Sequence, residues 1–204
     1  MNVLVVFCHP DPRSFQASIL AEAVERLAGD GHAVRVLDLY AIGFDPVLDG
    51  EAWRAHRRDE EHPAPDLADH VAALREADGL VLICPTWWYG LPAMLKGWFD
   101  RVWRPGVAFT LEGGVFRTHH LAKVKRLAVI TTYGSPRLFI ERIVGDPVRR
   151  AVVRGLALQF ARGVRVRWAP IYAVDGKSPA TLARARSRAV DRVARLFGRA
   201  SEVS

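Results

Sequence analysis

The stretch LVLICPTWWYGLPAMLKGWFDRVWRPGVAF, residues 80–109, holds the features that decide the fold. It opens with an apolar run, Leu80 to Cys84, that is too short for a buried helix and is bounded by a glycine and a proline. This pattern indicates a strand covered on both faces. A helix is expected to begin at Pro92, because the fixed φ of proline suits a first helical turn. The Pro-Thr-Trp-Trp-Tyr-Gly loop between them lies where open α/β sheets bind ligands, and its aromatic residues favour a flat ligand or another chain.

The same alternation of apolar strand and amphipathic helix recurs on both sides of this stretch. The expected strands are Val3–Cys8, Ala33–Leu39, Leu80–Cys84, Arg126–Thr132 and one within Val164–Val174. The expected helices are Gln16–Ala28, Asp66–Glu76 with Asp66 as cap, Pro92–Trp103, Asp146–Arg162 and one that begins at Ser178 and Pro179. This alternation, without a convincing linker, predicts an α/β protein with a doubly wound parallel sheet, as a single domain over residues 1–204. Residues 48–65 lack periodicity and are expected to form a surface insertion, in which Trp53 needs a packing partner.

The loop HPDPRSFQ, residues 9–16, is a second candidate for binding. Its prolines prevent a helix, and Ser14 is a natural N-cap for the helix that follows. A helix N-terminus offers free amides and a positive dipole end to a phosphate, and His9, Arg13 and Ser14 supply further donors. Because no Walker or GxGxxG pattern is present, these residues alone leave a merely capped helix as the alternative.

Composition and cysteine spacing narrow the classes of protein to which the chain can belong. The chain has 204 residues, of which 50% are hydrophobic and 25% charged, as expected for a globular protein with a sizeable core. No apolar run approaches the roughly 18 residues of a membrane span, and no leader pattern precedes the first strand, so a cytoplasmic location is expected. Cys8 and Cys84 lack the spacing of a zinc site or a disulfide framework, so we interpret them as buried thiols and expect no metal site.

The net charge of +7 raises nucleic acid as a partner. Much of this charge falls near the C-terminus, at helical spacing, on Arg184, Arg188, Arg192, Arg195 and Arg199. Such spacing opposite apolar residues is typical of the solvated face of an amphipathic helix. No RNA-binding motif or zinc-finger spacing accompanies it, so nucleic-acid binding is not expected.

Three strings carry a family resemblance. PTWWYGLPAMLKGWFDRV, residues 85–102, followed by GVAF, resembles the signature of flavodoxin-like NAD(P)H:quinone oxidoreductases. HPDPRSFQ is similar to the flavin-phosphate loop of that family, with Gln16 where the family commonly has Asn. TTYGS, residues 131–135, is similar to its Thr-Thr-Gly-Gly-Ser loop, with Tyr133 in place of a glycine. The resemblance implies a five-stranded sheet of order 2-1-3-4-5, in which these three loops lie side by side.

The resemblance also implies a non-covalent flavin, FMN or FAD. The phosphate would lie at the first loop and the ring against the other two. The implied cofactor-binding residues are His9, Arg13, Ser14, Phe15, Gln16, Pro85, Thr86, Trp87, Trp88, Tyr89, Gly90, Thr131, Thr132, Tyr133 and Gly134. The sequence leaves open whether the side chain of Tyr133 points away from the ring or borders its pocket.

The family reaction is a ping-pong transfer of hydride from NAD(P)H, through flavin N5, to a quinone or similar two-electron acceptor. Its best-known mammalian members carry a Tyr and a His as a proton relay, where this chain has Leu138 or Phe139 and then Val144. Tyr89 and Tyr133 are therefore the catalytic candidates for proton supply, with solvent as the alternative. A regulatory subunit of a potassium efflux system, with a membrane transporter as partner, and an azo- or nitro-compound reductase are the competing interpretations.

A homodimer is expected because the loop aromatics, Trp53 and Trp103 exceed what one small domain comfortably buries. In relatives of the family, the region after the second strand helps form the dimer interface. The interface is therefore predicted to include the helix from Pro92 to Trp103 and the insertion after Tyr40.

Overall fold

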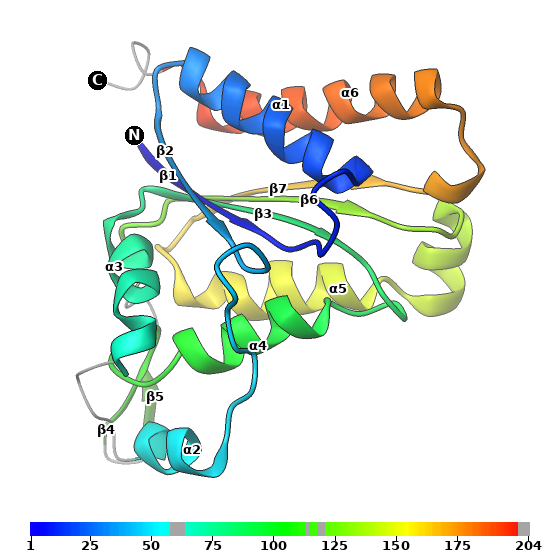
Figure 1. The fold of residues 1–204 in the computed structure, drawn as a ribbon. Helices are drawn as coiled ribbons and strands as arrows, with labels where there is room; N and C mark the ends of the chain where they lie inside the picture. Colours follow the sequence, from blue (N-terminus) through cyan, green and yellow to red (C-terminus); the bar gives the residue numbers. More distant parts are fainter. Residues whose placement is uncertain (58–63, 113–114, 118–120, 200–204) are drawn as a thin grey trace.

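A five-stranded parallel sheet forms the centre of the protein (Figure 1). The computed structural model describes residues 1–57, 64–112, 115–117 and 121–199. The strands are β1 (Asn2–Phe7), β2 (Ala33–Asp38), β3 (Gly79–Pro85), β6 (Arg126–Thr132) and β7 (Arg165–Ile171), in the spatial order β2-β1-β3-β6-β7. Counted along the chain, this is the predicted order 2-1-3-4-5. The register pairs Phe7 with Ile83 and Ile83 with Ile130, so the loops after β1, β3 and β6 leave the sheet at one edge.

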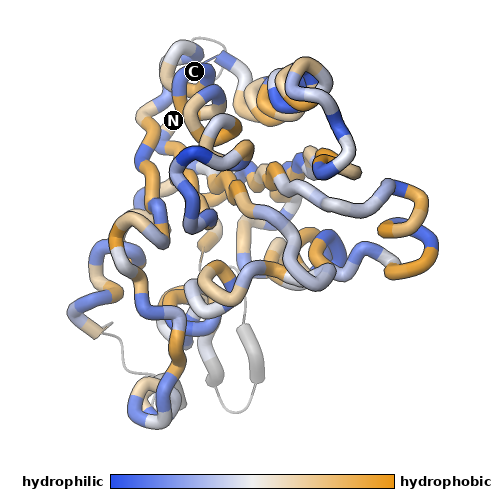
Figure 2. The backbone as a smooth tube through the Cα atoms, turned by 45° about the vertical axis from the view of Figure 1, so that its right-hand side comes forward, coloured by the Kyte–Doolittle hydropathy of each residue, from blue (hydrophilic) through white to orange (hydrophobic). Residues whose placement is uncertain are grey.

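Helices cover both faces of this sheet (Figure 1). One face carries α1 (Phe15–Gly29) and α6 (Pro179–Phe197), and the other carries α3 (Ala68–Glu76), α4 (Ala93–Val102) and the segment that begins with α5 (Pro147–Arg149). Every residue of β3 is buried, as predicted. Its side chains alternate: Val81 and Ile83 join the core under α1 and α6, whereas Leu80 and Leu82 join the core over α3 and α4. The hydrophobic residues accordingly concentrate along the central strands (Figure 2).

One unpredicted helix and one wrong helix cap lie between β2 and β3. Residues 48–65, expected to form a surface insertion without periodicity, contain α2 (Gly50–Arg57), because Asp49 Oδ1 accepts the amides of Glu51 and Ala52 at 2.9 and 2.8 Å and so caps a helix. Residues 58–63 of that segment lie outside the described part of the chain. Asp66 does not cap α3: it lies in the 3₁₀ turn Pro65–Leu67 and pairs with Arg101 at 2.8 Å.

The predicted helix Asp146–Arg162 is also irregular. After α5 the chain forms a π-helical turn, Arg150–Gly155, and a 3₁₀ turn, Leu156–Gln159. A further π-helical turn, Phe139–Val144, precedes α5. Two short antiparallel strands, β4 (Thr110–Glu112) and β5 (Val115–Arg117), follow α4. The turn and the two strands were not predicted.

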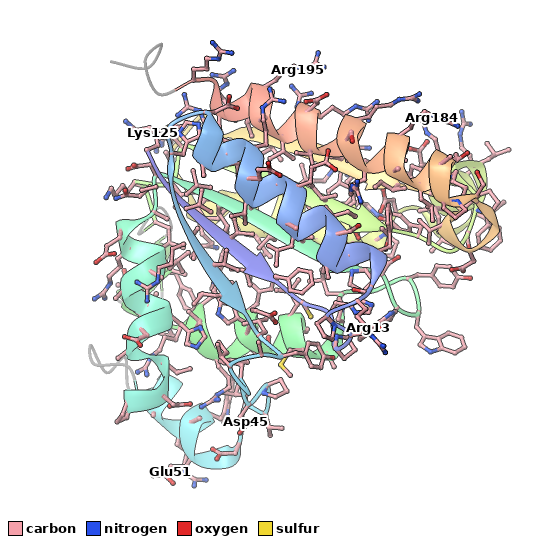
Figure 3. All side chains as sticks on the ribbon, turned by 45° about the horizontal axis from the view of Figure 1, so that its top comes forward. Arg13, Asp45, Glu51, Lys125, Arg184 and Arg195 are labelled. Atoms are coloured by element: carbon pink, nitrogen blue, oxygen red, sulfur yellow. The ribbon has the colours of Figure 1, made fainter. Side chains whose placement is uncertain are left out.

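The C-terminal helix matches the interpretation of its arginines. Arg184 and Arg195 lie along the outer side of α6 (Figure 3), while Ala189, Val190 and Val193 are buried. Both cysteines are buried free thiols, and burial raises the pKa of Cys8 to about 12. Within the described ranges, no helix combines the length and the apolar character that crossing a membrane requires.

Candidate functional site

The first loop ends at a capped helix, as the sequence predicted. Ser14 Oγ accepts the amide of Ala17 at 3.1 Å and so begins α1. The amides of Phe15 and Gln16 lie in the first helical turn, where no intrahelical acceptor exists. These amides and the Ser14 hydroxyl are therefore available to an anion in front of the helix.

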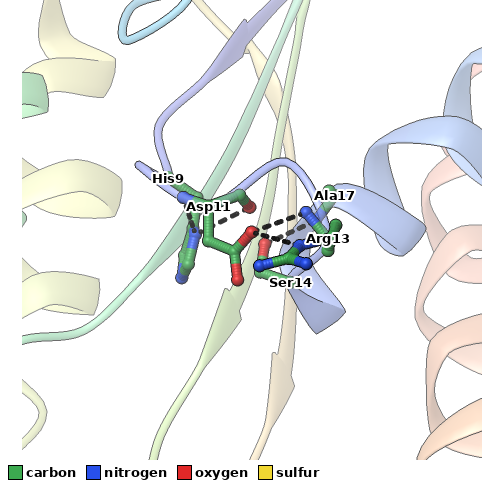
Figure 4. A network of polar contacts seen from close by, with 5 residues as sticks. All are labelled: His9, Asp11, Arg13, Ser14 and Ala17. Atoms are coloured by element: carbon green, nitrogen blue, oxygen red, sulfur yellow. Dashed lines mark hydrogen bonds and ion pairs between the residues drawn. The ribbon is translucent and has the colours of Figure 1, made fainter.

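His9 and Arg13 take different roles in this loop (Figure 4). His9 Nδ1 lies 3.0 Å from the Asp11 amide nitrogen and 3.2 Å from the Asp11 carbonyl oxygen. In the shorter contact the amide donates to Nδ1, which places the proton of the neutral ring on Nε2. The His9 ring therefore keeps a donor for a ligand. Arg13 instead pairs with Asp11, Nε to Oδ1 at 3.6 Å, and its side chain is 91% exposed.

The second loop is a tight turn in a strained conformation. Trp87 and Gly90 exchange amide-to-carbonyl hydrogen bonds of 3.1 and 3.0 Å, which leaves Trp88 and Tyr89 at the tip with φ of 50° and 60°. Such left-handed angles are uncommon for bulky residues and cluster at ligand sites. Trp88 is 96% exposed. Among the described residues, the amides of Trp88 and Tyr89 have no acceptor.

Thr132 joins the third loop to the other two. Its carbonyl accepts both the amide and the hydroxyl of Thr86, at 2.9 and 2.8 Å. Its hydroxyl accepts from Gln16 Nε2 at 3.0 Å in a buried contact. Gln16, which stands where the resembled family has Asn, thus ties the start of α1 to the end of β6. Its Oε1 is buried and has no partner within the described chain.

The three loops enclose a cavity of about 770 Å³ at the carboxyl edge of the sheet. Ten of the residues predicted to bind a cofactor line it: His9, Ser14, Phe15, Gln16, Pro85, Thr86, Trp87, Trp88, Thr132 and Gly134. An adjoining cavity of about 200 Å³ shares Thr86, Trp88 and Gly134 with it and is also lined by Tyr89 and Tyr133. Arg13, Gly90 and Thr131 line neither cavity: Gly90 closes the turn and Thr131 is buried within β6.

Sequence reasoning missed a fourth wall, formed by Val174, Asp175 and Leu182. These residues follow β7 and enter α6, so their place after the last parallel strand was the signal that could have found them. A Cβ at Gly134 would lie 2.5 Å from Asp175 Oδ2. The third loop therefore passes close to the Asp175 side chain at this wall.

Tyr133 borders the smaller cavity but directs its hydroxyl into the interior. The hydroxyl donates to Asp146 Oδ1 at 2.6 Å, and the residue is 2% exposed. Burial foremost, and then the hydrogen bond and charge of Asp146, raise the pKa of this phenol far above its usual range. A phenol held in this way is a poor proton donor. Of the two tyrosines predicted to be catalytic, Tyr89 is therefore the better placed to supply a proton, because it is 38% exposed.

The doubly wound parallel sheet, with a cavity at its carboxyl edge, places this protein in the class of open α/β proteins, which bind ligands at that edge. The family model for the flavodoxin-like fold matches residues 1–196. Human ribosyldihydronicotinamide dehydrogenase [quinone] is 33% identical over 166 residues, which cover 72% of this chain and 70% of the relative. The guinea pig (Cavia porcellus) NAD(P)H dehydrogenase [quinone] 1 is 33% identical over 161 residues, which cover 71% of this chain and only 58% of the relative.

Among solved structures, the NAD(P)H:quinone oxidoreductase of Methanothermobacter marburgensis superposes with a TM-score of 0.81 at 26% identity, over 94% of this chain and 96% of that one. The chain belongs to the flavodoxin-like family that includes the NAD(P)H:quinone oxidoreductases.

Proposed function

We propose that this protein is a flavin-dependent NAD(P)H oxidoreductase that reduces a quinone or a similar two-electron acceptor. The observation that carries the proposal is the cavity at the carboxyl edge of the sheet. It lies between the N-terminus of α1, whose free amides can bind an anion, and the strained aromatic turn after β3. Thr132 is hydrogen-bonded to both of these elements, through Gln16 and Thr86. The names of the relatives support the same activity. The matched segment of the guinea pig enzyme is little more than half of that protein, so the activity is proposed for this chain rather than transferred to it.

The residues present fit a flavin. At one end of the cavity, the free amides of Phe15 and Gln16, the Ser14 hydroxyl and His9 Nε2–H form a set of donors suited to a phosphate. At the other end, the amides of Trp88 and Tyr89 lack acceptors among the described residues, as expected for donors that bind a ring edge. A volume of about 770 Å³ is in the range of ligand pockets.

When bound, a flavin would supply the chemistry of hydride transfer between NAD(P)H and the acceptor. The protein supplies position and electrostatics. The α1 N-terminus and His9 anchor the phosphate, and the loop amides stabilise negative charge on the ring edge. Trp87 and Trp88 border the cavity. Tyr89, which lines the adjoining cavity, is the proposed proton donor to the acceptor. NAD(P)H and the acceptor use the same opening in turn.

The opening of the site favours an apolar, planar acceptor. Trp88 at 96%, Leu138 at 71%, Ile143 at 74% and Phe139 at 40% are exposed apolar side chains of the second loop and of the segment that follows the third. The rings of Tyr89 and Phe139 lie 6.1 Å apart, so the two segments meet. An apolar rim of this kind binds aromatic surface better than charged ligands.

We also propose that the protein acts as a homodimer of single flavin-binding domains. One premise of this prediction was wrong: Trp103 is buried at 8% exposure, packed edge-to-face on Phe99 and Phe160 within its own protomer. Trp53 supports the homodimer, because this residue is 53% exposed and lines an apolar cavity of about 480 Å³ beside α4.

The test is reconstitution of the flavin-free protein with FMN and with FAD, followed by kinetics. Quenching of flavin fluorescence at micromolar protein is expected, with oxidation of NADH or NADPH that depends on an added benzoquinone. Double-reciprocal plots should be parallel for a ping-pong reaction. Failure of both flavins to bind would refute the proposal, whereas binding without quinone-dependent turnover would refute the acceptor assignment alone.

A further inference from the structure

Asp146 is a buried carboxylate that lies outside the cavity and that the proposed reaction does not use. It is 5% exposed and precedes α5 with φ of 46°, and its amide donates to the Ile140 carbonyl at 2.9 Å. Its Oδ1 accepts two hydrogen bonds, from the Tyr133 hydroxyl at 2.6 Å and from the Arg149 amide at 3.3 Å. A non-glycine residue keeps a left-handed conformation only where its surroundings fix it. The carboxylate is therefore held in one place.

Tyr133 carries this constraint to the wall of the proposed cofactor site. Its amide donates to the Ile171 carbonyl at 2.9 Å, and its carbonyl accepts the Val174 amide at 3.1 Å, so its backbone is joined to the end of β7. Its ring stacks on Tyr172, with centroids 5.0 Å apart. Tyr133 also lines the smaller cavity beside Gly134. The third loop is thus held by β7 through its backbone and by Asp146 through one side chain.

The wall that Tyr133 supports is shared by the two cavities. Gly134, the next residue, contributes to each of them. A Cβ at this position would lie 2.5 Å from Asp175 Oδ2, so the backbone passes close to the Asp175 side chain. A small displacement here changes the shape of the cavity, and cofactor sites lose affinity when their walls are not preorganised.

We propose that Asp146 is a positioning residue for the cofactor: through the Tyr133 hydroxyl it fixes the Thr132–Gly134 backbone as a wall of the cavity. This inference rests on the proposed flavin function. A hydrogen bond to a buried carboxylate is among the strong ones, and its removal leaves that carboxylate short of a donor. Loss of the bond therefore releases the wall on one side, with the β7 contacts still in place.

The experiment compares five variants with the wild-type protein, each measured for FMN affinity by fluorescence quenching and for the visible absorption of the bound flavin. Tyr133→Phe removes only the hydroxyl. Asp146→Ala removes its acceptor, and Asp146→Asn keeps both an acceptor and a helix cap. The double variant Tyr133→Phe with Asp146→Ala tests whether the two act as one unit. Tyr172→Phe is the matched control, because its hydroxyl donates to Glu141 rather than to Asp146.

We expect Tyr133→Phe and Asp146→Ala each to weaken FMN binding about tenfold, with the double variant no weaker than either single one. Asp146→Asn and Tyr172→Phe should stay within about threefold of wild type and keep its flavin spectrum. Thermal unfolding of the flavin-free proteins identifies variants that fail to fold. If Asp146→Ala is one of them, Tyr133→Phe decides the question, because it keeps the ring, the helix cap and the backbone contacts.

Three results would overturn the inference: wild-type affinity in Tyr133→Phe, an Asp146→Asn variant as weak as Asp146→Ala, or additive losses in the double variant. These results refute the positioning role and leave the proposed function standing. Failure of the wild-type protein to bind either flavin would instead refute the proposed function, and this inference with it.

Discussion

The two nitrogens of His9 face different partners. Nδ1 accepts the amide of Asp11 at 3.0 Å and so shapes the loop, while Nε2–H stays available to a ligand. Nothing in the residue pattern predicts that His9 also holds its own loop together. An alanine at this position would therefore remove a loop contact together with the ligand contact.

Asparagine separates these two roles at His9. Its side-chain oxygen can accept the Asp11 amide, as in an Asx turn, but it brings no donor to the place of Nε2. We expect His9→Asn to leave the stability of the flavin-free protein within about 0.5 kcal/mol of wild type and to weaken flavin binding on the order of tenfold. Chemical denaturation and flavin titration check the two parts. Unchanged flavin affinity in a stable variant would show that the phosphate lies elsewhere.

A second histidine links stability to pH. His70 is buried against Phe44, and its Nδ1 accepts from Trp98 Nε1 at 3.2 Å. Burial is the largest influence and lowers its pKa below the ordinary 6.5; Asp69 and Asp66 oppose this shift, and Arg35 and Arg101 add to it. The unfolded chain therefore takes up a proton more readily than the folded protein as the pH falls through this value.

Stability contributed by neutral His70 is thus present above pH 6.5 and is lost as the pH falls below it. Thermal unfolding across this range should show a falling midpoint in the wild-type protein. His70→Gln keeps an acceptor for Trp98 and cannot titrate, so its midpoint should fall less steeply. Identical pH profiles for the two proteins would contradict the assignment.

At the scale of whole elements, two helices offer matched caps. Ser14 Oγ accepts the Ala17 amide at 3.1 Å at the start of α1, and Ser178 Oγ accepts the Thr181 amide at 3.4 Å at the start of α6. Only Ser14 lines the cavity. The pair therefore separates the effect of losing a cap from the effect of losing a ligand contact.

Alanine at either cap should cost about 1 kcal/mol of unfolding free energy. Only Ser14→Ala should also weaken flavin binding, by about tenfold, because it removes a donor to the phosphate. Denaturant unfolding of the flavin-free proteins and flavin titrations measure both effects. Equal affinities for Ser14→Ala and Ser178→Ala would argue that the α1 terminus does not hold the phosphate.

The elements that sequence predicted well share one property: their apolar pattern is long enough to identify. β3 and β6 are buried runs, and α1 and α6 carry both an amphipathic face and a serine cap. The turns Phe139–Val144 and Arg150–Gly155 were missed because π-helical hydrogen bonding leaves no distinct period in the sequence.

The candidate site divides in the same way. The loops after β1, β3 and β6 were found because their residues are chemically distinctive and because topology brings strand ends together. Asp175 in the cavity wall and the hydrogen bond from Tyr133 to Asp146 were missed, because they depend on contacts that only the folded chain brings together. The outward pairing of Arg13 with Asp11 likewise depends on the conformation of the loop.

At the scale of the molecule, the surface beside α4 tests the proposed dimer. Trp53 on α2 stands 53% exposed over an apolar cavity that Phe99 and Trp103 also line. Trp53→Glu places a charge on this surface and should convert the dimer to a monomer of 22.7 kDa in light scattering. Arg184→Glu, on the outer side of α6, is the control and should keep the dimer. A wild-type monomer at working concentration would contradict the proposal directly.

The edge strand β7 bears on whether copies of the protein can add to one another strand by strand. β7 ends the sheet, and exposed Arg165 and Arg167 together with Pro170 occupy it. A proline offers no amide to an incoming strand, and like charges repel the same margin of another copy. Fibre growth by strand addition is therefore discouraged on this side, and self-association is left to helical surfaces, where it can close at two copies instead of continuing without limit.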